Sequence, residues 1–148
     1  MVRWAILLKL VGFLEILKKR MLIIKFSFSN TGLIQQAFKI RRKVFVVEQN
    51  CPYQDVDGKD QKAMHILGYH KEQLVAYTRV FKPGYYFDNA SIGRVVVKEN
   101  ARQYGFGKDI MKASIAFIED TLDLSTIELS AQTYLKKFYN ALGFKEIG

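Results

Sequence analysis

The sequence has little of what a disulfide-bonded, metal-binding or secreted protein needs. Cys51 is the only cysteine among 148 residues, which excludes an internal disulfide framework and predicts a reducing, cytoplasmic location. The single cysteine and the two histidines form no cluster with zinc-ligand spacing. The acidic stretch 55–60 has some likeness to a calcium loop, but Ile66 stands where an EF-hand needs glutamate. We therefore expect no metal.

A membrane span and a secretory signal are also missing. Residues 1–20 are strongly apolar, but Lys9 and Glu15 interrupt them and the span is too short to cross a bilayer. No small-residue cleavage site follows an unbroken apolar core, as a secretory signal requires. We expect no stable membrane insertion. Residues 1–20 are interpreted as an apolar and basic N-terminal extension, folded as a helix on an available apolar surface, before a domain over residues 21–148.

Acidic residues are scarcer than basic ones, 14 against 23, and the net charge is +9. This balance alone would suggest a nucleic-acid partner. However, five basic residues and one glutamate lie within residues 1–20, so residues 21–148 carry only +5. The densest basic patch, 39–43, closes a predicted helix, where cations favourably meet the helix dipole, and no aromatic residues alternate with it as a stacking platform. We expect no nucleic-acid binding.

The remaining composition is that of one globular domain, with 49% apolar residues. Apolar residues recur at helical spacing over 33–45, 110–122 and 134–142. Short β-branched and apolar runs between them predict strands. The predicted order is β-α-β-β-β-α-β-α-β, a single α/β layer fold with a mixed sheet and without repeats or linkers. The strands are expected at 22–28, 65–69, 74–81, 91–97, 126–131 and 144–147.

The chain is organised around the stretch 92–118, where a strand feeds a glycine-containing loop that opens a helix. The loop reads R-Q-Y-G-F-G over 102–107. Glycines let successive backbone N–H groups turn toward one point, and the N-terminus of the helix adds partial positive charge. Arg102 and Lys108 flank this point with fixed charge. The pattern favours a phosphate-bearing ligand, although an ordinary strand-to-helix connection remains the alternative.

Two common phosphate-binding motifs do not fit this loop. A Walker A loop would need glycine in place of Arg102 and serine or threonine in place of Asp109. A Rossmann fingerprint would need glycine in place of Ile110 and an earlier position in the chain. What remains, R-x-x-G-x-G after a V-V-V strand, resembles the pyrophosphate loop of the GNAT acetyltransferases, which bind acetyl-CoA.

Two further blocks extend this resemblance over roughly residues 22–148. The stretch 129–144 reads L-S-A-Q-T-Y-L-K-K-F-Y-N-A-L-G-F, similar to the last GNAT motif, in which a strand precedes a helix with Phe-Tyr and then Gly-Phe. The stretch 42–65 reads R-K-V-F-V-V-E-Q-N-C-P-Y-Q-D-V-D-G-K-D-Q-K-A-M-H and resembles the ElaA-type subfamily. The resemblance implies a mixed, mostly antiparallel central sheet flanked by helices, the acyl-CoA N-acyltransferase fold.

The resemblance also implies where acetyl-CoA binds. The backbone of the strand at Val95, Val96 and Val97 would bond the pantetheine arm, and the following loop would wrap the pyrophosphate. Gln132 stands where the family commonly has an asparagine that contacts CoA, which makes its role less secure. The loop residues implied are Arg102, Gln103, Tyr104, Gly105, Phe106, Gly107 and Lys108.

For catalysis, Tyr139 matches the family tyrosine that protonates the departing CoA thiolate. A thiolate has a conjugate pKa of about 8.5, so an adjacent phenol can hand over a proton as the bond breaks. Outside the motif, Tyr139 would be read as a half-buried helix aromatic. Glu48 is our candidate for the base that deprotonates the amine, with His65 as an alternative. Cys51 is not needed for direct transfer.

The predicted function is therefore acetyl-CoA-dependent N-acetylation of a small-molecule or peptide primary amine by direct transfer. The alternative is a GNAT-like CoA-binding module with little or no turnover. The sequence does not identify the acceptor, and it leaves a homodimer open.

One strand of the family fold has no counterpart at the expected place. In that fold another strand follows the Gly-Phe strand and inserts beside the strand matching 126–131. The sequence ends at Gly148, so we expect this last strand to be missing and the edges beside it to be open. Residues 1–20 could cover the exposed surface. On this reasoning the chain would be less stable than its relatives, and weakly active or inactive.

Overall fold

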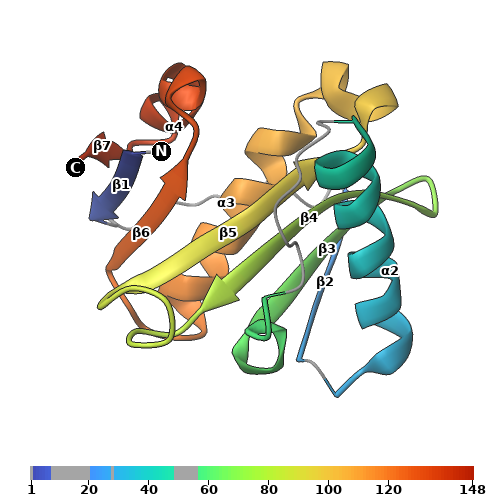
Figure 1. Cartoon of the computed structure of the whole chain (residues 1–148), viewed down its shortest axis with the longest axis horizontal. Helices are drawn as coiled ribbons and strands as arrows, with labels where there is room; N and C mark the ends of the chain where they lie inside the picture. Colours follow the sequence, from blue (N-terminus) through green and yellow to red (C-terminus); the bar gives the residue numbers. More distant parts are fainter. Residues whose placement is uncertain (1, 8–20, 28, 49–56) are drawn as a thin grey trace.

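The computed structural model describes residues 2–7, 21–27, 29–48 and 57–148 (Figure 1). The strands described form one sheet in the order β2-β3-β4-β5-β6-β1-β7. The strands are β1 (Val2–Leu7), β2 (Leu22–Ser27), β3 (Met64–His70), β4 (Gln73–Phe81), β5 (Ala90–Val97), β6 (Thr126–Ala131) and β7 (Lys145–Glu146). The helical segments are α2 (Thr31–Arg41), η1 (Arg42–Glu48), η2 (Asp60–Lys62), η3 (Glu99–Tyr104), α3 (Phe106–Asp120), η4 (Thr133–Leu135) and α4 (Lys136–Ala141).

The sheet is mixed and mostly antiparallel, as the sequence predicted. Its pairs are antiparallel except for β5 and β6, which run parallel. From β2 onward the chain order of helices and strands follows the predicted β-α-β-β-β-α-β-α-β. A two-residue turn joins the antiparallel strands β3 and β4, and the crossover through α3 makes β5 and β6 parallel.

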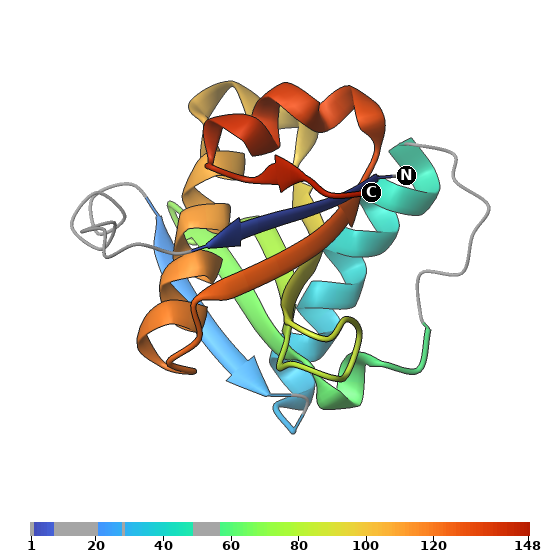
Figure 2. The same ribbon diagram turned by 90° about the vertical axis from the view of Figure 1, so that its left-hand side faces the viewer.

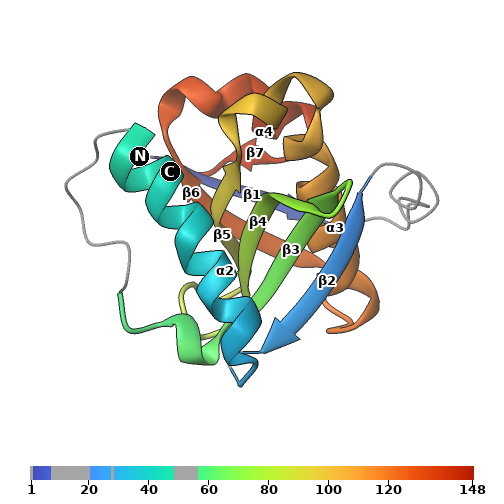
Figure 3. The same cartoon turned by 90° about the vertical axis from the view of Figure 1, so that its right-hand side faces the viewer.

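Helices cover the two faces of the sheet, with α2 on one and α3 on the other (Figures 1 and 3). Because side chains alternate along a strand, neighbouring residues serve different cores. Ile66 and Leu67 on β3 are both fully buried, Ile66 in the α3-side core and Leu67 in the α2-side core. The sheet is therefore apolar on both faces at its centre.

The helix α2 begins at a polar cap and ends in a change of helical form. The Asn30 side chain accepts a hydrogen bond from the Leu33 amide at 3.2 Å, which satisfies one of the free N–H groups of the first turn. Ile34 and Ala37 are buried against the sheet. The sequence predicted one helix through Phe45, but the α-helix stops at Arg41 and continues as the π-helical segment η1.

The helix α3 supplies most of the other core. Its residues Ile110, Met111 and Ile118 are fully buried, which agrees with the apolar spacing seen in the sequence. Its first turn follows Gly105, whose φ of 74° lies in the left-handed region that glycine adopts without strain. Within the described part of the chain, no helix is long and apolar enough to cross a membrane.

The prediction of a helix at the N-terminus is wrong for residues 2–7. These residues form strand β1, which lies between β6 and β7 (Figure 2). A short apolar run fits a helix or a strand equally well, and here the neighbouring strands decide the outcome. Residues 8–20 lie outside the described part of the chain.

The predicted gap in the sheet is also not observed. β1 pairs with β6 over its whole length, from Val2 opposite Ala131 to Leu7 opposite Thr126. The edge of β6 that was expected to be open is therefore hydrogen-bonded, and the position expected for a missing last strand is filled. We expected low stability and weak activity because this edge would be open. That reason no longer holds, since the edge is paired.

Candidate active site

The candidate site lies where β5 and β6 separate. The two strands pair only at Ala90 opposite Ile127 and at Ser91 opposite Glu128. Beyond these pairs each strand runs on for several residues without pairing to the other, and Figure 1 shows them spreading apart. On its other side, β5 stays paired with β4 up to Val97. The β6-facing backbone of β5 is therefore open toward the space between the strands.

A cleft of about 540 Å³ occupies this region, a size common for small-molecule sites. Its walls come from the end of β5, from the junction of η3 and α3, from η4 and α4, and from η1. We call it the central cleft. It is lined by Val44, Val95, Val96, Val97, Arg102, Gly105, Gly107, Lys108, Tyr134, Leu135, Phe138 and Tyr139.

The glycine loop forms the cationic end of the central cleft. Gly105 both ends η3 and caps α3, so the first free N–H groups of a 15-residue helix begin at the cleft. Arg102 donates a 3.0 Å hydrogen bond through Nε to the Val97 carbonyl, which fixes the loop against the end of β5. A Cβ added at Gly107 would lie 3.5 Å from the Phe138 ring, so the backbone of this loop packs closely against the opposite wall. The geometry suits an anion such as a diphosphate.

Tyr139 forms part of the opposite wall, on α4. Only 4% of its surface is exposed, and its ring packs edge-to-face on Phe138 and Phe144 at centroid distances of 5.0 and 5.9 Å. This burial raises the pKa of Tyr139 to about 12. The phenol therefore carries its proton at neutral pH, as a proton donor must.

The structure brings most of the predicted cofactor residues to the central cleft. Val95, Val96, Val97, Arg102, Gly105, Gly107 and Lys108 all line it. Four others do not. Gln103, Tyr104 and Gln132 are exposed beside it, and Phe106 is buried in the α3-side core. Their roles in binding stay predictions.

The two candidate bases are Glu48 and His65. Glu48 ends η1, the segment whose Val44 lines the cleft, but its side chain lies outside the described part of the chain. His65 is fully buried and does not line the cleft. Its ring stacks on Phe26 at 5.2 Å, its Nδ1 lies 2.6 Å from the Tyr77 hydroxyl, and its Nε2 lies 3.0 Å from the Asp60 carbonyl. A carbonyl only accepts, so Nε2 carries the proton and Nδ1 accepts from Tyr77. His65 is therefore a structural residue rather than a base.

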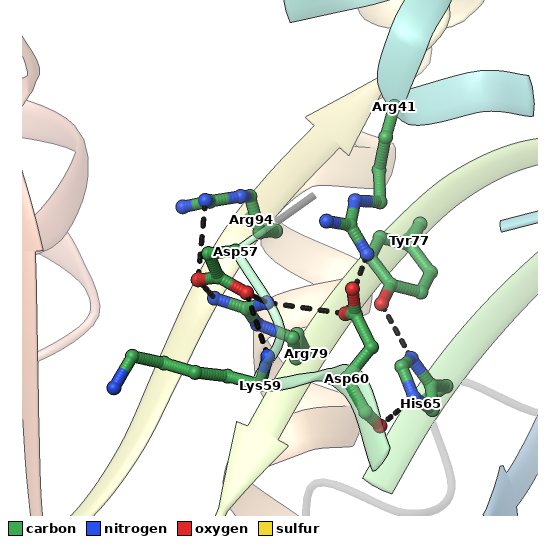
Figure 4. Close-up of polar contacts among 8 residues, drawn as sticks. All are labelled: Arg41, Asp57, Lys59, Asp60, His65, Tyr77, Arg79 and Arg94. Carbon is green, nitrogen blue, oxygen red and sulfur yellow. Dashed lines mark hydrogen bonds and ion pairs between the residues drawn. The ribbon is translucent and has the colours of Figure 1, made fainter. Parts of the chain in front are cut away.

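His65 belongs to a buried polar network that our sequence reasoning missed (Figure 4). Arg41 donates to Asp60 at 2.7 Å, and Arg79 donates to Asp60 at 3.1 Å. Arg79 also holds both carboxylate oxygens of Asp57 at 2.9 Å, and Arg94 approaches the same carboxylate at 3.4 Å. The acidic stretch with some likeness to a calcium loop thus binds arginines.

The electrostatics of this network follow from burial and pairing. The Asp57 side chain is 20% exposed, and its burial alone would raise the pKa of the carboxyl group. The hydrogen bonds and positive charge of Arg79, with the Lys59 amide and Arg94, outweigh that effect and lower the pKa of Asp57 to about 2. For His65, burial lowers the pKa below its usual 6.5. The network links α2, the stretch 57–62 and three strands. A trace of it in the sequence is the position of Arg41 on an otherwise apolar helix face, which does not reveal its partners.

Comparison with known proteins agrees with this geometry. The GNAT acetyltransferase domain model matches residues 27–148. Protein ElaA of Escherichia coli K12 is 40% identical over 108 residues, covering 72% of this chain and 71% of ElaA. The residues matched by the family model include the glycine loop and Tyr139.

Solved structures show the same relationship. An acyl-CoA N-acyltransferase from Pseudomonas aeruginosa superposes with a TM-score of 0.76 at 34% identity, covering 83% of this chain and 87% of that one. The structure of E. coli ElaA gives a TM-score of 0.75 at 33% identity, covering 82% and 85%. The chain therefore belongs to the GNAT acetyltransferase family, as an ElaA-like member.

Proposed function

We propose that this chain is an acetyl-CoA-dependent N-acetyltransferase that moves the acetyl group directly to a primary amine. Acyl transfer is the activity of the family to which it belongs. The finer assignment is supported by one observation: the proton-carrying Tyr139 and the N-terminus of α3 open onto the same central cleft. One group suits a leaving thiolate and the other suits a diphosphate, and acetyl-CoA carries both.

The walls of the cleft fit the rest of that molecule. Past Ser91, β5 pairs with no strand on its β6-facing edge among the described residues, and a pantetheine arm could lie along this edge. Such an arm would add to β5 as an extended strand. The Val97 carbonyl accepts a hydrogen bond from Arg102, so the proposed diphosphate loop would lie at the end of that arm.

The chemistry is a balanced exchange at one carbonyl carbon. The neutral amine nitrogen forms a bond to the thioester carbon, and the resulting oxyanion is stabilised by a backbone N–H of the Val95–Val97 stretch. The C–S bond then breaks, and the sulfur takes a proton from the Tyr139 hydroxyl. A phenol with a pKa of about 12 is a weak acid. However, the thiolate leaves into the same apolar surroundings, which raise its proton affinity too.

Glu48 remains our hypothesis for the group that takes the proton from the amine. It follows Val44 in η1, and Val44 lines the central cleft. A carboxylate at this end of the cleft would meet the incoming amine before it reaches the thioester.

The experiment is a screen of primary amines for release of free CoA from acetyl-CoA. It uses the full chain, with mass spectrometry of the acetylated amine as a second readout. We expect at least one amine to yield CoA and product in equal amounts. If acetyl-CoA stabilises the protein against heat but no amine releases CoA, the alternative of a CoA-binding module is favoured instead.

A further inference from the structure

Strand β1 holds the neighbours of α4 together. It pairs with β6 on one side over six residues, and with β7 on the other, where Trp4 lies opposite Glu146 and Ala5 opposite Lys145 (Figure 2). The Arg3 amide donates to Gly148 at 2.9 Å, and the Arg3 carbonyl accepts from Ile147 at 3.0 Å. Within the described chain, β7 joins the sheet only through β1.

The end of β6 depends on the same strand. After Glu128, β6 no longer pairs with β5, so the strand partners of Leu129–Ala131 in the described structure are Trp4, Arg3 and Val2. η4 and α4 follow directly, and β7 comes next. In the sequence, the segment that carries Tyr139 therefore lies between β6 and β7. In the sheet, β1 lies between these two strands. β1 is therefore paired with both strands that flank this wall of the cleft.

A side-chain pair gives β1 its register. Glu128 on β6 is only 3% exposed, and its carboxylate receives an ion pair from Arg3 and a 3.0 Å hydrogen bond from Asn89. Burial alone would raise the pKa of Glu128, but these hydrogen bonds and the Arg3 charge lower it below its usual value. Arg3 lies opposite Ser130, so it reaches Glu128 as a diagonal neighbour on the same face. A slip of one residue would turn Arg3 to the other face and leave the buried carboxylate without its cation.

We propose that Arg3 is a positioning residue: through Glu128 it sets the register of Val2–Leu7 in the slot between β6 and β7, and so holds the Tyr139 wall of the cleft in place. The occupant is recognised by two features: backbone pairing on both edges and one arginine at a fixed place. This goes beyond the proposed function, because the slot is defined without reference to any substrate.

The first experiment tests the occupant. Since the Arg3 N–H and C=O face β7, Leu7 opposite Thr126 is a non-hydrogen-bonded pair toward β6, the kind in which the two backbones lie closer together. The full chain with Cys51→Ser, Leu7→Cys and Thr126→Cys should form an intrachain disulfide on mild oxidation. A matched control, with the second cysteine at Ser125 instead, should not, because Ser125 precedes β6 and is not paired with Leu7. No cross-link, or the same yield in both, overturns the assignment. A cross-linked dimer also overturns it, because it assigns the slot to a second copy.

The second experiment tests Arg3 by amide hydrogen exchange followed by NMR. Arg3→Met keeps the apolar stem and removes the charge. We expect exchange at the Leu129 and Ala131 amides to accelerate by about 10- to 100-fold, as for loss of a bond to a charged group, while Ile66 in β3 is unchanged. Arg3→Lys should restore slow exchange. So should the oxidised Leu7–Thr126 cross-link placed in the Arg3→Met chain.

The outcomes separate this inference from the proposed function. Hydrogen exchange needs neither acetyl-CoA nor an amine, so it stays informative if no amine is acetylated. If Arg3→Met leaves the Leu129 and Ala131 amides as protected as before, or if the cross-link fails to restore them, Arg3 does not position this wall.

Discussion

At the scale of single residues, Tyr139 is our proposed proton donor in the cleft. Its burial holds the pKa at about 12, so its proton stays in place across the working range of pH. Replacing Tyr139 by Phe keeps the packing on Phe138 and Phe144 and removes only the hydroxyl. We expect turnover to fall by about 10²- to 10⁴-fold with little change in acetyl-CoA affinity, measured by steady-state CoA release and by calorimetry. Tyr85→Phe, on an exposed loop, is the control. Equal turnover in the two variants would make Tyr139 a packing residue.

His65 predicts how stability depends on pH. Because burial lowers its pKa below 6.5, the unfolded chain binds a proton that the folded chain resists. The free energy of unfolding should therefore be fully developed above about pH 6.5 and decrease as the pH falls from 7 toward 5. His65→Gln should show a flatter profile over this interval in urea denaturation. A slope as steep as that of the parent chain would contradict this assignment.

Single residues were predictable from the sequence where a motif fixes them, and not otherwise. The glycine loop and Tyr139 could be placed because short-range spacing determines their strand, loop and helix. The arginines of the buried network could not, since their partners lie 19 to 37 positions away in the sequence. Arg41 was interpreted as one of the cations that meet the helix dipole at the end of the predicted helix. Its side chain is in fact fully buried. Only the three-dimensional meeting of α2 with the stretch 57–62 reveals its role.

At the scale of elements, the turn from η3 into α3 is the feature most sensitive to a single substitution. Gly105 has a φ of 74°, and it lines the central cleft at the proposed diphosphate site. Gly105→Asp would add both backbone strain and a carboxylate there. We expect the protein to fold but to lose the thermal stabilisation given by acetyl-CoA.

Gly84 offers a matched control for this change. It also has a positive φ, 90°, but it lies on an exposed loop that does not line the cleft, with nothing near a Cβ. Gly84→Asp should cost similar intrinsic stability and keep the stabilisation by acetyl-CoA. If both variants respond to acetyl-CoA alike, the diphosphate does not bind at the α3 loop.

Most elements were predicted within a residue or two, because their apolar periodicity and their caps agree. β1 is the exception. Its apolar run has no distinctive period, and its state depends on β6 and β7, which lie more than a hundred residues away. Sequence reasoning did anticipate that this segment would cover the space beside β6, but not that it would do so as a strand. Pairing between distant segments decides such cases.

At the scale of the whole molecule, Asp60 joins a helix to a strand of the central sheet. It binds Arg41 of α2 and Arg79 of β4, whose side chains are 0% and 1% exposed. Asp60→Ala would leave two buried guanidinium groups without this carboxylate. We expect the free energy of unfolding to fall by about 3–5 kcal/mol in urea denaturation. Asp88→Ala, on the exposed loop before β5, should change it by less than about 0.5 kcal/mol. A small decrease in the free energy of unfolding for Asp60→Ala would mean that the network does not stabilise the fold.

The most direct test of the central claim, that one cleft both binds acetyl-CoA and positions its thioester, is a crystal structure of the full chain with acetyl-CoA. We predict the diphosphate against the Arg102–Lys108 loop, the pantetheine along Val95–Val97, and the sulfur within about 2.6–3.2 Å of the Tyr139 hydroxyl or one water away. Acetyl-CoA bound outside the central cleft, or with its sulfur turned away from Tyr139, would contradict the claim.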